Sequence, residues 1–346
     1  MRPDLAIGLV AAAALLLAMF LTGMVRRRAL RRGVLDVPNS RSSHTTPTPR
    51  GGGVAIAIAT GAGFVALHLL GAQSLDFLIA LLGGGAAIAV IGAIDDRQHV
   101  AAWIRLTVHL AAAWWALHWL GGPPALRIGD HMVAMGVAGY VFASVAIVWT
   151  VNLFNFMDGI DGIAASEAVF VAWGGAALAL VGGAPGAVAA ASLVLGAACC
   201  GFLRWNWPPA RIFMGDVGSG FLGFTVAVLA LAAAHEQAAA GFAWLILGAV
   251  FFVDATVTLV RRLRRGARPH QAHRTHGYQW LARRWRSHRK VTVAVLAFDL
   301  LWLLPLATLA TLFPRAALWF LLLALVPTVV VVVTAGAGRP ENAAAD

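Results

Sequence analysis

The sequence predicts an all-α polytopic integral membrane protein, and three observations lead to this fold class. The chain has 346 residues, 60% of them are hydrophobic, and the mean hydropathy is +0.80. Only 12% of the residues are charged, compared with about 25% in a soluble domain. The hydrophobic residues form long runs, and a helix needs about 20 apolar residues to cross a bilayer. This pattern excludes a disordered chain and an ordinary soluble enzyme.

The apolar runs predict about eleven transmembrane helices, and residues 1–346 are expected to form a single transmembrane domain. The first run is too long for a signal peptide and is followed directly by three arginines, so we expect a retained helix. Residues 335–346 are polar enough to predict a disordered C-terminal tail. The predicted spans are 4–25, 52–71, 77–94, 101–120, 133–153, 163–182, 187–204, 217–234, 240–260, 291–312 and 315–334.

The basic residues predict the orientation of these spans. Eleven spans put the termini on opposite sides, and alternate loops then share a side. One set of loops, with the adjoining helix ends, holds 23 of the 26 Lys and Arg residues. The positive-inside rule places this set in the cytoplasm, with the N-terminus outside and the C-terminus inside. The net charge of +11 therefore needs no nucleic acid as a partner. The predicted cytoplasmic loops are 26–51, 95–100, 154–162, 205–216 and 261–290.

Five acidic residues stand at the cytoplasmic ends of apolar runs, where a charge near the bilayer indicates function. Two of them are adjacent at the end of the third span, where the helix dipole disfavours a carboxylate. The alternative for this pair is a solvated loop start with Arg97 as partner. The five are Asp95, Asp96, Asp158, Asp161 and Asp216.

Amide and carboxylate side chains recur at every third position between residues 152 and 161. On a helix, consecutive members share a face, but the first and last point to opposite sides. We therefore expect Gly159 and Gly162 to break the helix. Such oxygen-rich sets bind hard cations or phosphate-bearing ligands, although an Asn/Asp/Gly turn is the alternative. The four residues are Asn152, Asn155, Asp158 and Asp161.

Asp216 stands just before the eighth span and is followed by glycines. Asp is a preferred N-cap, so a purely structural role is the alternative here. The glycines also permit a phosphate to approach the helix N-terminus. The acidic clusters share one side and would repel one another, which a bound divalent cation resolves. Mg²⁺ prefers one or two carboxylates plus substrate phosphates, so the residues alone suggest a membrane enzyme acting on a phosphate or pyrophosphate.

The predicted loop 261–290 holds three histidines among arginines, at positions His270, His273 and His276. Zinc binding is disfavoured because the neighbouring residues are Arg. A phosphate contact fits better, since the guanidinium is a planar fork for phosphate, and we expect Arg274 to share it. The alternatives are a solvated loop for the histidines and a lipid-headgroup anchor for the first Arg block.

Three further positions, in two regions of the chain, draw attention. The first predicted loop carries His44 and Arg50, and the three glycines that follow suit the rim of a ligand site. Asp254 lies inside the ninth span, where we expect a structural role and a pairing with Arg261 or Arg262.

Five motifs in this order resemble the polyprenyl-phosphate N-acetylhexosamine-1-phosphate transferases of glycosyltransferase family 4. The resemblance runs from Asp36 to Gln279 and rests on the order, spacing and shared side of the motifs. The motifs are Asp36-x-Pro38 with Arg41, His44 and Pro49-Arg50-Gly-Gly; Asp95-Asp96; Asn152-x-x-Asn155-x-x-Asp158-Gly-x-Asp161-Gly; Phe213-Met-Gly-Asp216-x-Gly-Ser219; and the His loop.

The resemblance implies that a UDP-N-acetylamino sugar gives its sugar-1-phosphate to undecaprenyl phosphate in the bacterial inner membrane, releasing UMP. Mg²⁺, or Mn²⁺, is the implied cofactor, with Asp216 and Asp158 as metal ligands. Asp95, Asp96 and His276 are the implied catalytic residues, and the roles of the two adjacent acids stay interchangeable. The implied substrate contacts are Asn152, Asn155, Asp158, Asp161, His44, Arg50, His273 and Arg274.

One motif departs from the family pattern. Many members have His-x-His-His where this chain has His276-Gly-Tyr278-Gln279, and His273 stands where many have Asp. This variant resembles the branch that initiates O-antigen or related surface polysaccharides. A peptidoglycan-precursor or teichoic-acid-type member is the alternative. The sugar stays open between N-acetylglucosamine and deoxy-N-acetyl sugars, and so does the oligomeric state, a homodimer included.

Two other classes remain as alternatives. A transporter of a phosphorylated solute would place acids at the bilayer midplane and interrupt paired helices, whereas the five acids singled out here lie at one face. A CDP-alcohol phosphotransferase needs an Arg that is missing after Asp161-Gly162.

Overall fold

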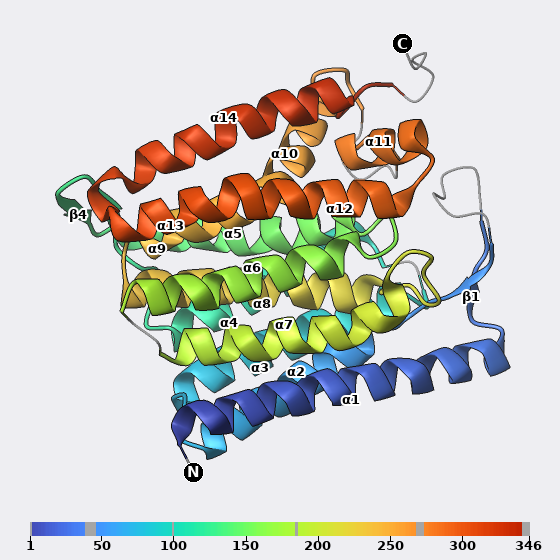
Figure 1. The fold of residues 1–346 in the computed structure, drawn as a ribbon, viewed down its shortest axis with the longest axis horizontal. Coiled ribbons are helices and arrows are strands. Elements are labelled where there is room, and N and C mark those ends of the chain that lie inside the picture. The colour runs from blue at the N-terminus through green and yellow to red at the C-terminus, as the bar shows by residue number, and fades with distance from the viewer. Residues whose placement is uncertain (1, 39–45, 99, 184–185, 268–272, 341–346) are drawn as a thin grey trace.

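In the computed structural model, long apolar helices run side by side along one axis of the molecule (Figure 1). The structure describes residues 2–38, 46–98, 100–183, 186–267 and 273–340. The helices are α1 (Pro3–Arg32), α2 (Gly53–Leu69), α3 (Leu75–Asp95), α4 (Ala102–Trp119), α5 (Gly136–Met157), α6 (Ile163–Val181), α7 (Ala187–Asn206), α8 (Asp216–Glu236), α9 (Ala240–Leu247), α10 (Ala249–Leu263), α11 (Gly277–Trp285), α12 (His288–Phe298), α13 (Leu304–Leu312) and α14 (Ala317–Ala335). A π-helical turn, η1 (Asp299–Leu303), joins α12 to α13, and a 3₁₀ turn, η2 (Pro314–Ala316), precedes α14.

The predicted all-α membrane fold is confirmed. Among the described residues, 8 helical segments are long and apolar enough to cross a membrane. The span predicted over 240–260 is instead a pair of helices, α9 and α10, bent by 71° at Gly248. The remaining two predicted spans are also helical: α2 is a shorter apolar helix of 17 residues, and α4 carries Arg105 with several His and Trp residues.

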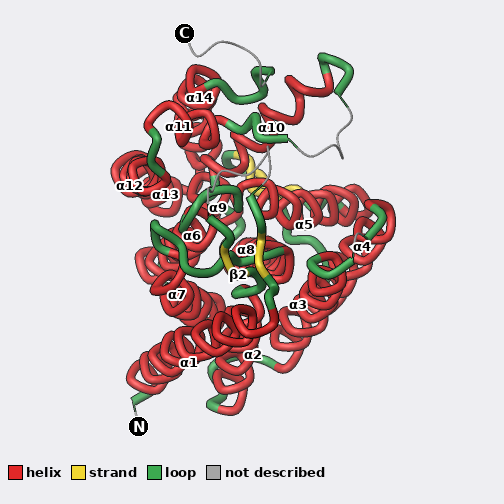
Figure 2. The backbone as a smooth tube through the Cα atoms, turned by 90° about the vertical axis from the view of Figure 1, so that its right-hand side faces the viewer, coloured by secondary structure: helices red, strands yellow, loops and turns green. Residues whose placement is uncertain are grey.

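α8 is the central helix of the bundle. It is surrounded by α2, α3, α5 and α6, as the view along the bundle shows (Figure 2), and 89% of its most apolar 18-residue window is buried. Small residues allow this packing, because a Cβ at Gly53 would overlap the backbone of Gly218 where α2 meets α8. Without a hydrophobic driving force between helices in lipid, such close backbone contact supplies much of the association.

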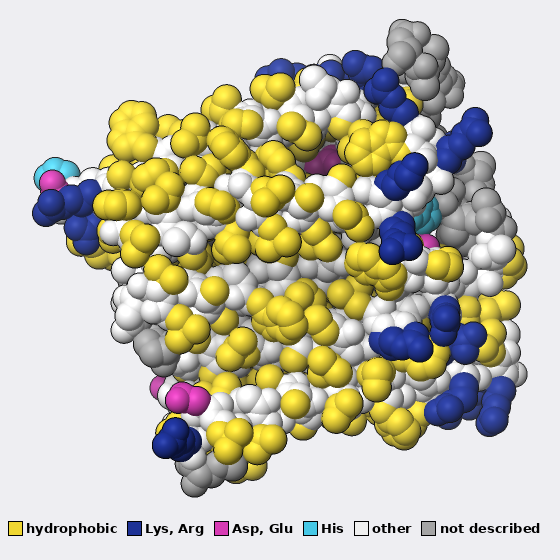
Figure 3. All heavy atoms as spheres, viewed as in Figure 1, with side chains coloured by type: hydrophobic (Ala, Val, Ile, Leu, Met, Phe, Trp, Pro, Cys, Tyr) yellow, Lys and Arg dark blue, Asp and Glu magenta, His cyan; other side chains and the backbone are white. Residues whose placement is uncertain are grey.

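Strands and loops gather at one end of the bundle. The strands β1 (Leu35–Asp36) and β2 (Thr48–Pro49) form an antiparallel pair there, beside the start of α8. The hairpin of β3 (Leu126–Ile128) and β4 (His131–Val133) lies at the other end, where α1 begins, whereas α14 ends on the side of β1 (Figure 1). Most Lys and Arg side chains in view cluster at the end that carries β1 (Figure 3).

The predicted loops are more ordered than their composition indicates. Residues 154–157 still belong to α5, and the predicted loop 261–290 contains the whole of α11. The start of the predicted disordered tail is packed, since Ala337 is fully buried and the backbone N–H of Gly338 donates to the carbonyl of Thr275 at 2.7 Å.

Candidate active site

Asp96 joins the end of α3 to the start of α8. Its Oδ1 accepts the backbone N–H of Asp216 at 3.0 Å and its Oδ2 accepts that of Val217 at 3.3 Å. The carboxylate therefore satisfies two of the N–H groups that a helix N-terminus leaves open. The sequence argument that a helix dipole disfavours Asp96 needs correction, because the positive end of α8 lies against it and favours its charge.

Arg50 bridges the same two acids. Its Nη2 lies 2.7 Å from Oδ1 of Asp96 and 3.0 Å from Oδ1 of Asp216. β2 delivers it there, since the carbonyl of Pro49 accepts the backbone N–H of Phe213 at 2.8 Å. Burial alone would lower the pKa of Arg50, but the charges of nearby carboxylates, led by Asp96 and Asp216, raise this pKa above its ordinary value. Arg50 is thus a fixed positive charge within the acidic cluster.

The polar segment 152–161 begins within α5 and continues past its end, so the helix breaks in this segment as predicted. The helix ends at Met157, and α6 starts after Gly162, which adopts a φ of 76°. Within α5, Nδ2 of Asn155 donates to Oδ1 of Asp216 at 3.1 Å and to Oγ of Ser219 at 3.2 Å. Asp158 follows the helix, and burial, then the charge of Asp216, raises its pKa well above the ordinary value.

Asp161 and Asn152 point to other partners. Oδ2 of Asp161 accepts the backbone N–H of Ala210 at 3.0 Å, and its Oδ1 lies 3.2 Å from Nδ1 of His288. Nδ2 of Asn152 donates to the carbonyl of Val148 in its own helix at 2.7 Å. The structure therefore brings the other three members of this motif to the site and leaves Asn152 outside the pocket lining.

Asp95 is held beside the cluster. Its Oδ1 accepts the backbone N–H of Val100 at 2.8 Å, and its Oδ2 lies 2.5 Å from Nη1 of Arg105. The carboxyl group also lies within hydrogen-bonding reach of Asp216. The alternative partner, Arg97, instead donates to the carbonyl of Ala93 at 3.2 Å.

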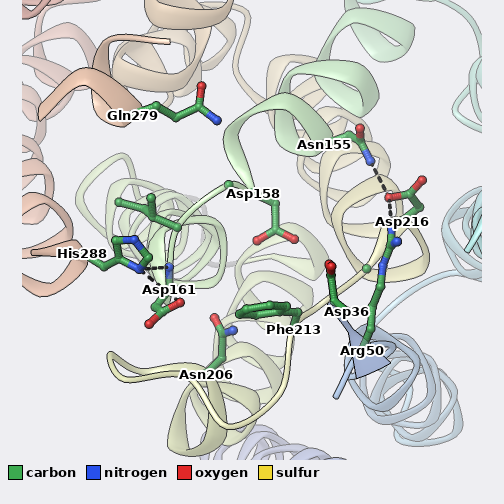
Figure 4. Close-up of a pocket in the computed structure, with 13 residues that line it drawn as sticks. Asp36, Arg50, Asn155, Asp158, Asp161, Asn206, Phe213, Asp216, Gln279 and His288 are labelled. Carbon is green, nitrogen blue, oxygen red and sulfur yellow. Dashed lines mark hydrogen bonds and ion pairs between the residues drawn. The ribbon is translucent and has the colours of Figure 1, made fainter. Parts of the chain in front are cut away.

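These side chains surround one pocket of about 250 Å³. Figure 4 shows Asp158 and Phe213 near its centre, with Asp161 and His288 on one side and Arg50 with Asp216 on the other. The lining residues are Asp36, Arg50, Asn155, Asp158, Gly159, Ile160, Asp161, Asn206, Phe213, Gly215, Asp216, Gln279 and His288.

Sequence reasoning did not single out two of the polar residues in this lining, Asn206 and His288. Asn206 ends α7, and its amide ties the backbone N–H of Gly162 at 3.0 Å to the carbonyl of Ile212 at 2.9 Å. A polar residue at the predicted cytoplasmic end of an apolar run was the signal for it. His288 begins α12, and nothing in the local sequence distinguishes it from the other residues of its basic loop.

Asp254 and His276 form a buried pair. Oδ1 of Asp254 lies 3.3 Å from Nδ1 of His276 and accepts the backbone N–H of Gly277 at 2.9 Å, while Oδ2 accepts that of Tyr278 at 3.0 Å. Asp254, expected to pair with Arg261 or Arg262, therefore caps α11. Arg261 donates to the carbonyl of Ala337 at 2.6 Å.

The residues around His276 pack behind the pocket. The ring of His273 stacks on that of His276 with centroids 5.0 Å apart, and burial, then the charges of His276 and Arg262, lowers the pKa of His273 to about 3. The carbonyl of Arg274 accepts Nη1 of Arg283 at 2.9 Å. His273, Arg274 and His276 do not line the pocket, so their substrate contacts stay predictions. His44 and His270 lie outside the described residues.

Tyr278 and Gln279, where this chain differs from the family's His motif, connect this loop to the pocket. The hydroxyl of Tyr278 donates to the carbonyl of Phe156 at 2.9 Å. Oε1 of Gln279 accepts the backbone N–H of His276 at 3.2 Å, and Gln279 lines the pocket opposite Gly159. A side chain at Gly159 would collide with Tyr278, so the glycine permits this contact.

The carboxylate oxygens of the pocket fit a hard cation whose coordination shell the substrate would complete. Across the described ranges, no three His, Cys, Asp or Glu side chains are grouped to hold a metal ion by themselves. Mg²⁺ commonly takes one or two carboxylates and completes its shell with phosphate oxygens and water. Asp216 and Asp158 both line the pocket and supply that number of carboxylates.

Comparison with known proteins defines the family. Residues 78–234 match the model described as glycosyl transferase family 4. A protein of Bacillus subtilis named probable undecaprenyl-phosphate N-acetylglucosaminyl 1-phosphate transferase is 32% identical over 259 residues, which cover 72% of this chain and 70% of the relative. The chain belongs to glycosyl transferase family 4. The resemblance inferred from its motifs is thereby confirmed.

Other relatives of this family 4 protein carry related names. The decaprenyl-phosphate N-acetylglucosaminephosphotransferase of Mycobacterium tuberculosis is 33% identical over 325 residues, or 84% of this chain and 79% of the relative. The phospho-N-acetylmuramoyl-pentapeptide-transferase of Chlamydia trachomatis is 38% identical over 124 residues, 35% of each chain. These bacterial relatives support a multi-pass membrane glycosyl-1-phosphate transferase.

Proposed function

We propose that this protein transfers N-acetylglucosamine-1-phosphate, or a closely related N-acetylamino-sugar-1-phosphate, from a UDP-sugar to undecaprenyl phosphate. The observation that carries the proposal is the convergence of Arg50, Asp158 and Asp216 in one pocket, with Asp96 bound to Arg50 beside it. The pocket is lined by Asp36 of β1 and by Asp216 at the start of α8, and β1 lies at one end of the apolar bundle (Figure 1). At such an end a soluble nucleotide sugar would meet the headgroup of a lipid. The relatives with the longest matches quoted above are named for polyprenyl phosphate and N-acetylglucosamine.

In the proposed reaction, an oxygen of the lipid phosphate attacks the phosphorus that carries the sugar. The bond from this phosphorus to the oxygen bridging the two phosphates of the donor breaks, and UMP leaves with the bridging oxygen. The sugar-1-phosphate and the lipid phosphate are then joined in a pyrophosphate. Phosphoryl transfer of this kind depends mainly on positioning and on stabilising negative charge.

The residues in and beside the pocket have different roles in the proposed reaction. Arg50 supplies a positive charge beside the start of α8, whose N-terminus favours anions. Asp96 holds both in place through its contacts to Arg50 and to the backbone of Asp216. Asn155 fixes the Asp216 carboxylate from α5. Asp95 or Asp96 is the candidate base that keeps the acceptor phosphate ionised, and the resemblance leaves the two interchangeable.

Mg²⁺ is the proposed cofactor, and Mn²⁺ is the proposed substitute. Asp216 and Asp158 would hold the ion, and when bound it would neutralise charge on the phosphates of the donor. Burial, and then the negative charge of Asp216, raises the pKa of Asp158. The crowding of carboxylates in one pocket supports a site that gains from a cation.

One assay tests the proposal directly. Purified protein in detergent receives undecaprenyl phosphate and one of several donors: UDP-N-acetylglucosamine, UDP-linked deoxy-N-acetyl sugars, or UDP-N-acetylmuramoyl-pentapeptide. We expect UMP release only when the lipid and an accepted donor are both present. Turnover of the pentapeptide donor would favour the alternative peptidoglycan role. No UMP release with any donor, together with uptake of a labelled phosphorylated solute into proteoliposomes, would favour a transporter.

The proposed pathway role concerns O-antigen or a related surface polysaccharide. It rests on the departure at Tyr278 and Gln279, both of which contact the pocket region. A strain lacking the gene should lose that glycan and keep its peptidoglycan. Loss of peptidoglycan synthesis would contradict the assignment.

A further inference from the structure

A second hollow adjoins the candidate active site. It has a volume of about 630 Å³ and shares two lining residues, Asp161 and His288, with the acidic pocket. On its other sides it is lined by basic side chains from the end of α11 and the start of α12, namely Arg283, Arg286 and Arg289. We call it the arginine hollow.

The wall between the two spaces is firmly held. Oδ1 of Asp161 lies 3.2 Å from Nδ1 of His288, and Oδ2 accepts the backbone N–H of Ala210 at 3.0 Å. The carbonyl of Asp161 accepts the hydroxyl of Thr292, one turn further along α12, at 3.1 Å. Figure 4 shows His288 and Asp161 facing each other at the edge of the pocket. A ligand in the arginine hollow would therefore lie directly behind a fixed His–Asp pair.

The basic side chains are brought together by an unusual turn. Arg286 ends α11 with a φ of 50°, and it is the single non-glycine residue with a positive φ in the described part of the chain. This left-handed conformation is uncommon for a long side chain. The turn brings Arg286 and Arg289 to the same hollow as Arg283, whose guanidinium lies 4.3 Å from the ring centroid of Trp280.

The charge of the hollow indicates its ligand. Arg283, Arg286 and Arg289 line a space in which Asp161 is the one carboxylate among the described lining residues. Asp161 already bonds to His288, and Nη1 of Arg283 also donates to the carbonyl of Arg274. Neighbouring guanidinium groups repel one another, and a phosphate relieves this repulsion because it accepts two hydrogen bonds from each planar fork.

We propose that the arginine hollow binds a phosphate mono- or diester beside the acidic pocket, against the His288–Asp161 pair that both spaces share. The phosphate belongs either to the nucleotide sugar or to an anionic lipid headgroup at the membrane surface. The first source rests on the proposed function; the second does not.

The test uses the full-length protein in nanodiscs and the double variant Arg286→Gln with Arg289→Gln. Glutamine, like arginine, is a long unbranched residue that must adopt the positive φ at position 286. It removes the positive charge and the planar guanidinium. The matched control replaces Arg31 and Arg32 by Gln, because these residues line a separate arginine-rich hollow beside α1 that shares no residue with the acidic pocket. A version with Lys at 286 and 289 keeps the charge and loses the fork.

Binding of UDP-N-acetylglucosamine is measured without undecaprenyl phosphate, in nanodiscs of neutral phosphatidylcholine. If the nucleotide sugar is the source, the Gln double variant should raise the Kd about tenfold, which is about 1.4 kcal/mol. The Lys version should fall between it and the wild type, and the control should bind like the wild type.

The lipid arm compares thermal unfolding in nanodiscs with and without phosphatidylglycerol. If a lipid headgroup is the source, phosphatidylglycerol should raise the unfolding midpoint of the wild type and of the control but not of the Gln double variant. A Gln double variant that matches the wild type in both arms overturns the inference and leaves the arginines as topology anchors. Since neither arm needs turnover, a failure of the proposed reaction is distinguishable: the UMP assay would be negative while these binding differences persist.

Discussion

Asp96 caps the helix that Asp216 begins: the carboxylate at the end of α3 accepts the N–H of Asp216 at 3.0 Å, and Arg50 bridges both acids. Two residues 120 positions apart thus form one structural unit. A cap from a distant helix fixes where α8 starts and how its N-terminus faces the pocket. Because the Asp96 side chain is only 12% exposed, its contacts are shielded from water.

Replacing Asp96 should therefore reduce both stability and activity. Asp96→Ala removes both acceptors of the cap, and loss of an N-cap typically costs about 1 kcal/mol. Asp96→Asn keeps one acceptor oxygen and should unfold at an intermediate temperature, with turnover still low because Arg50 loses a charge partner. Thermal unfolding of the purified proteins measures this. The control, Asp76→Ala, changes an exposed acid in the first turn of α3 at its other end. An unchanged midpoint for Asp96→Ala would show that the cap carries no stability.

Asp216→Asn should leave the fold intact and abolish most turnover. The amide has the size of the carboxylate and can still accept from Asn155, but it lacks the charge of a metal ligand. We expect weaker Mn²⁺ binding by electron paramagnetic resonance, and UMP release that falls furthest when Mg²⁺ is limiting. Normal turnover of this variant at limiting Mg²⁺ would show that the metal assignment is wrong.

His276→Ala should lower turnover at least tenfold, or about 1.4 kcal/mol of transition-state stabilisation. Because His276 bonds to Asp254, which also caps α11, Asp254→Asn should lower turnover as well. A phosphate contact would appear mainly in the KM of one substrate, whereas a positioning role would lower kcat with an unchanged KM. Arg264→Gln at the end of α10 is the control and should have much less effect. Wild-type kinetics in His276→Ala would exclude both roles.

The orientation in the membrane is tested by labelling. A single cysteine at Ser287, in a background without Cys199 and Cys200, should react with a membrane-impermeant maleimide only from the cytoplasmic side. Asp130→Cys is the matched control, since Asp130 is exposed in the turn between β3 and β4 at the opposite end of the bundle. It should react only from outside. Labelling of position 287 in intact cells would reverse the predicted topology.

The sequence predicts the helices well because the length and hydropathy of a span are local properties. The break at Gly248 escaped prediction because the apolar run continues through it. The partners of individual side chains were harder to predict from the sequence. Asp254 was expected to pair with Arg261 or Arg262 near the end of its own helix, and local reasoning gave no sign of its contact with His276, which comes from another element.

The prediction that the acidic motifs share one side of the membrane located most of the site, since Asp158 and Asp216 line one pocket and Asp96 bonds to the backbone of Asp216 beside it. It could not predict which motif members face inward. Asn152 has the spacing of the motif, yet its amide is satisfied by its own helix. His288 was missed because its partner Asp161 is 127 residues distant.

Gly159 is where the acidic segment and the His loop touch, and a methyl group there should disturb both. A Cβ would collide with the hydroxyl oxygen of Tyr278 and lie 2.9 Å from Nε2 of Gln279. Gly159→Ala should therefore lower the unfolding midpoint and UMP release together, because the pocket wall must shift to relieve the overlap. Gly8→Ala on α1 is the control, since a Cβ at Gly8 meets no atom within 4 Å.

Tyr278→Phe removes the colliding oxygen, and also its hydrogen bond to the carbonyl of Phe156, which is worth about 1 kcal/mol. If the hydroxyl is the obstacle, the double variant with Gly159→Ala and Tyr278→Phe should be more stable than the sum of the single losses predicts. Residues in contact show such coupling, typically about 0.5–3 kcal/mol. Additive losses would mean that the methyl group is resisted elsewhere, and the contact between Gly159 and Tyr278 would then not explain the glycine.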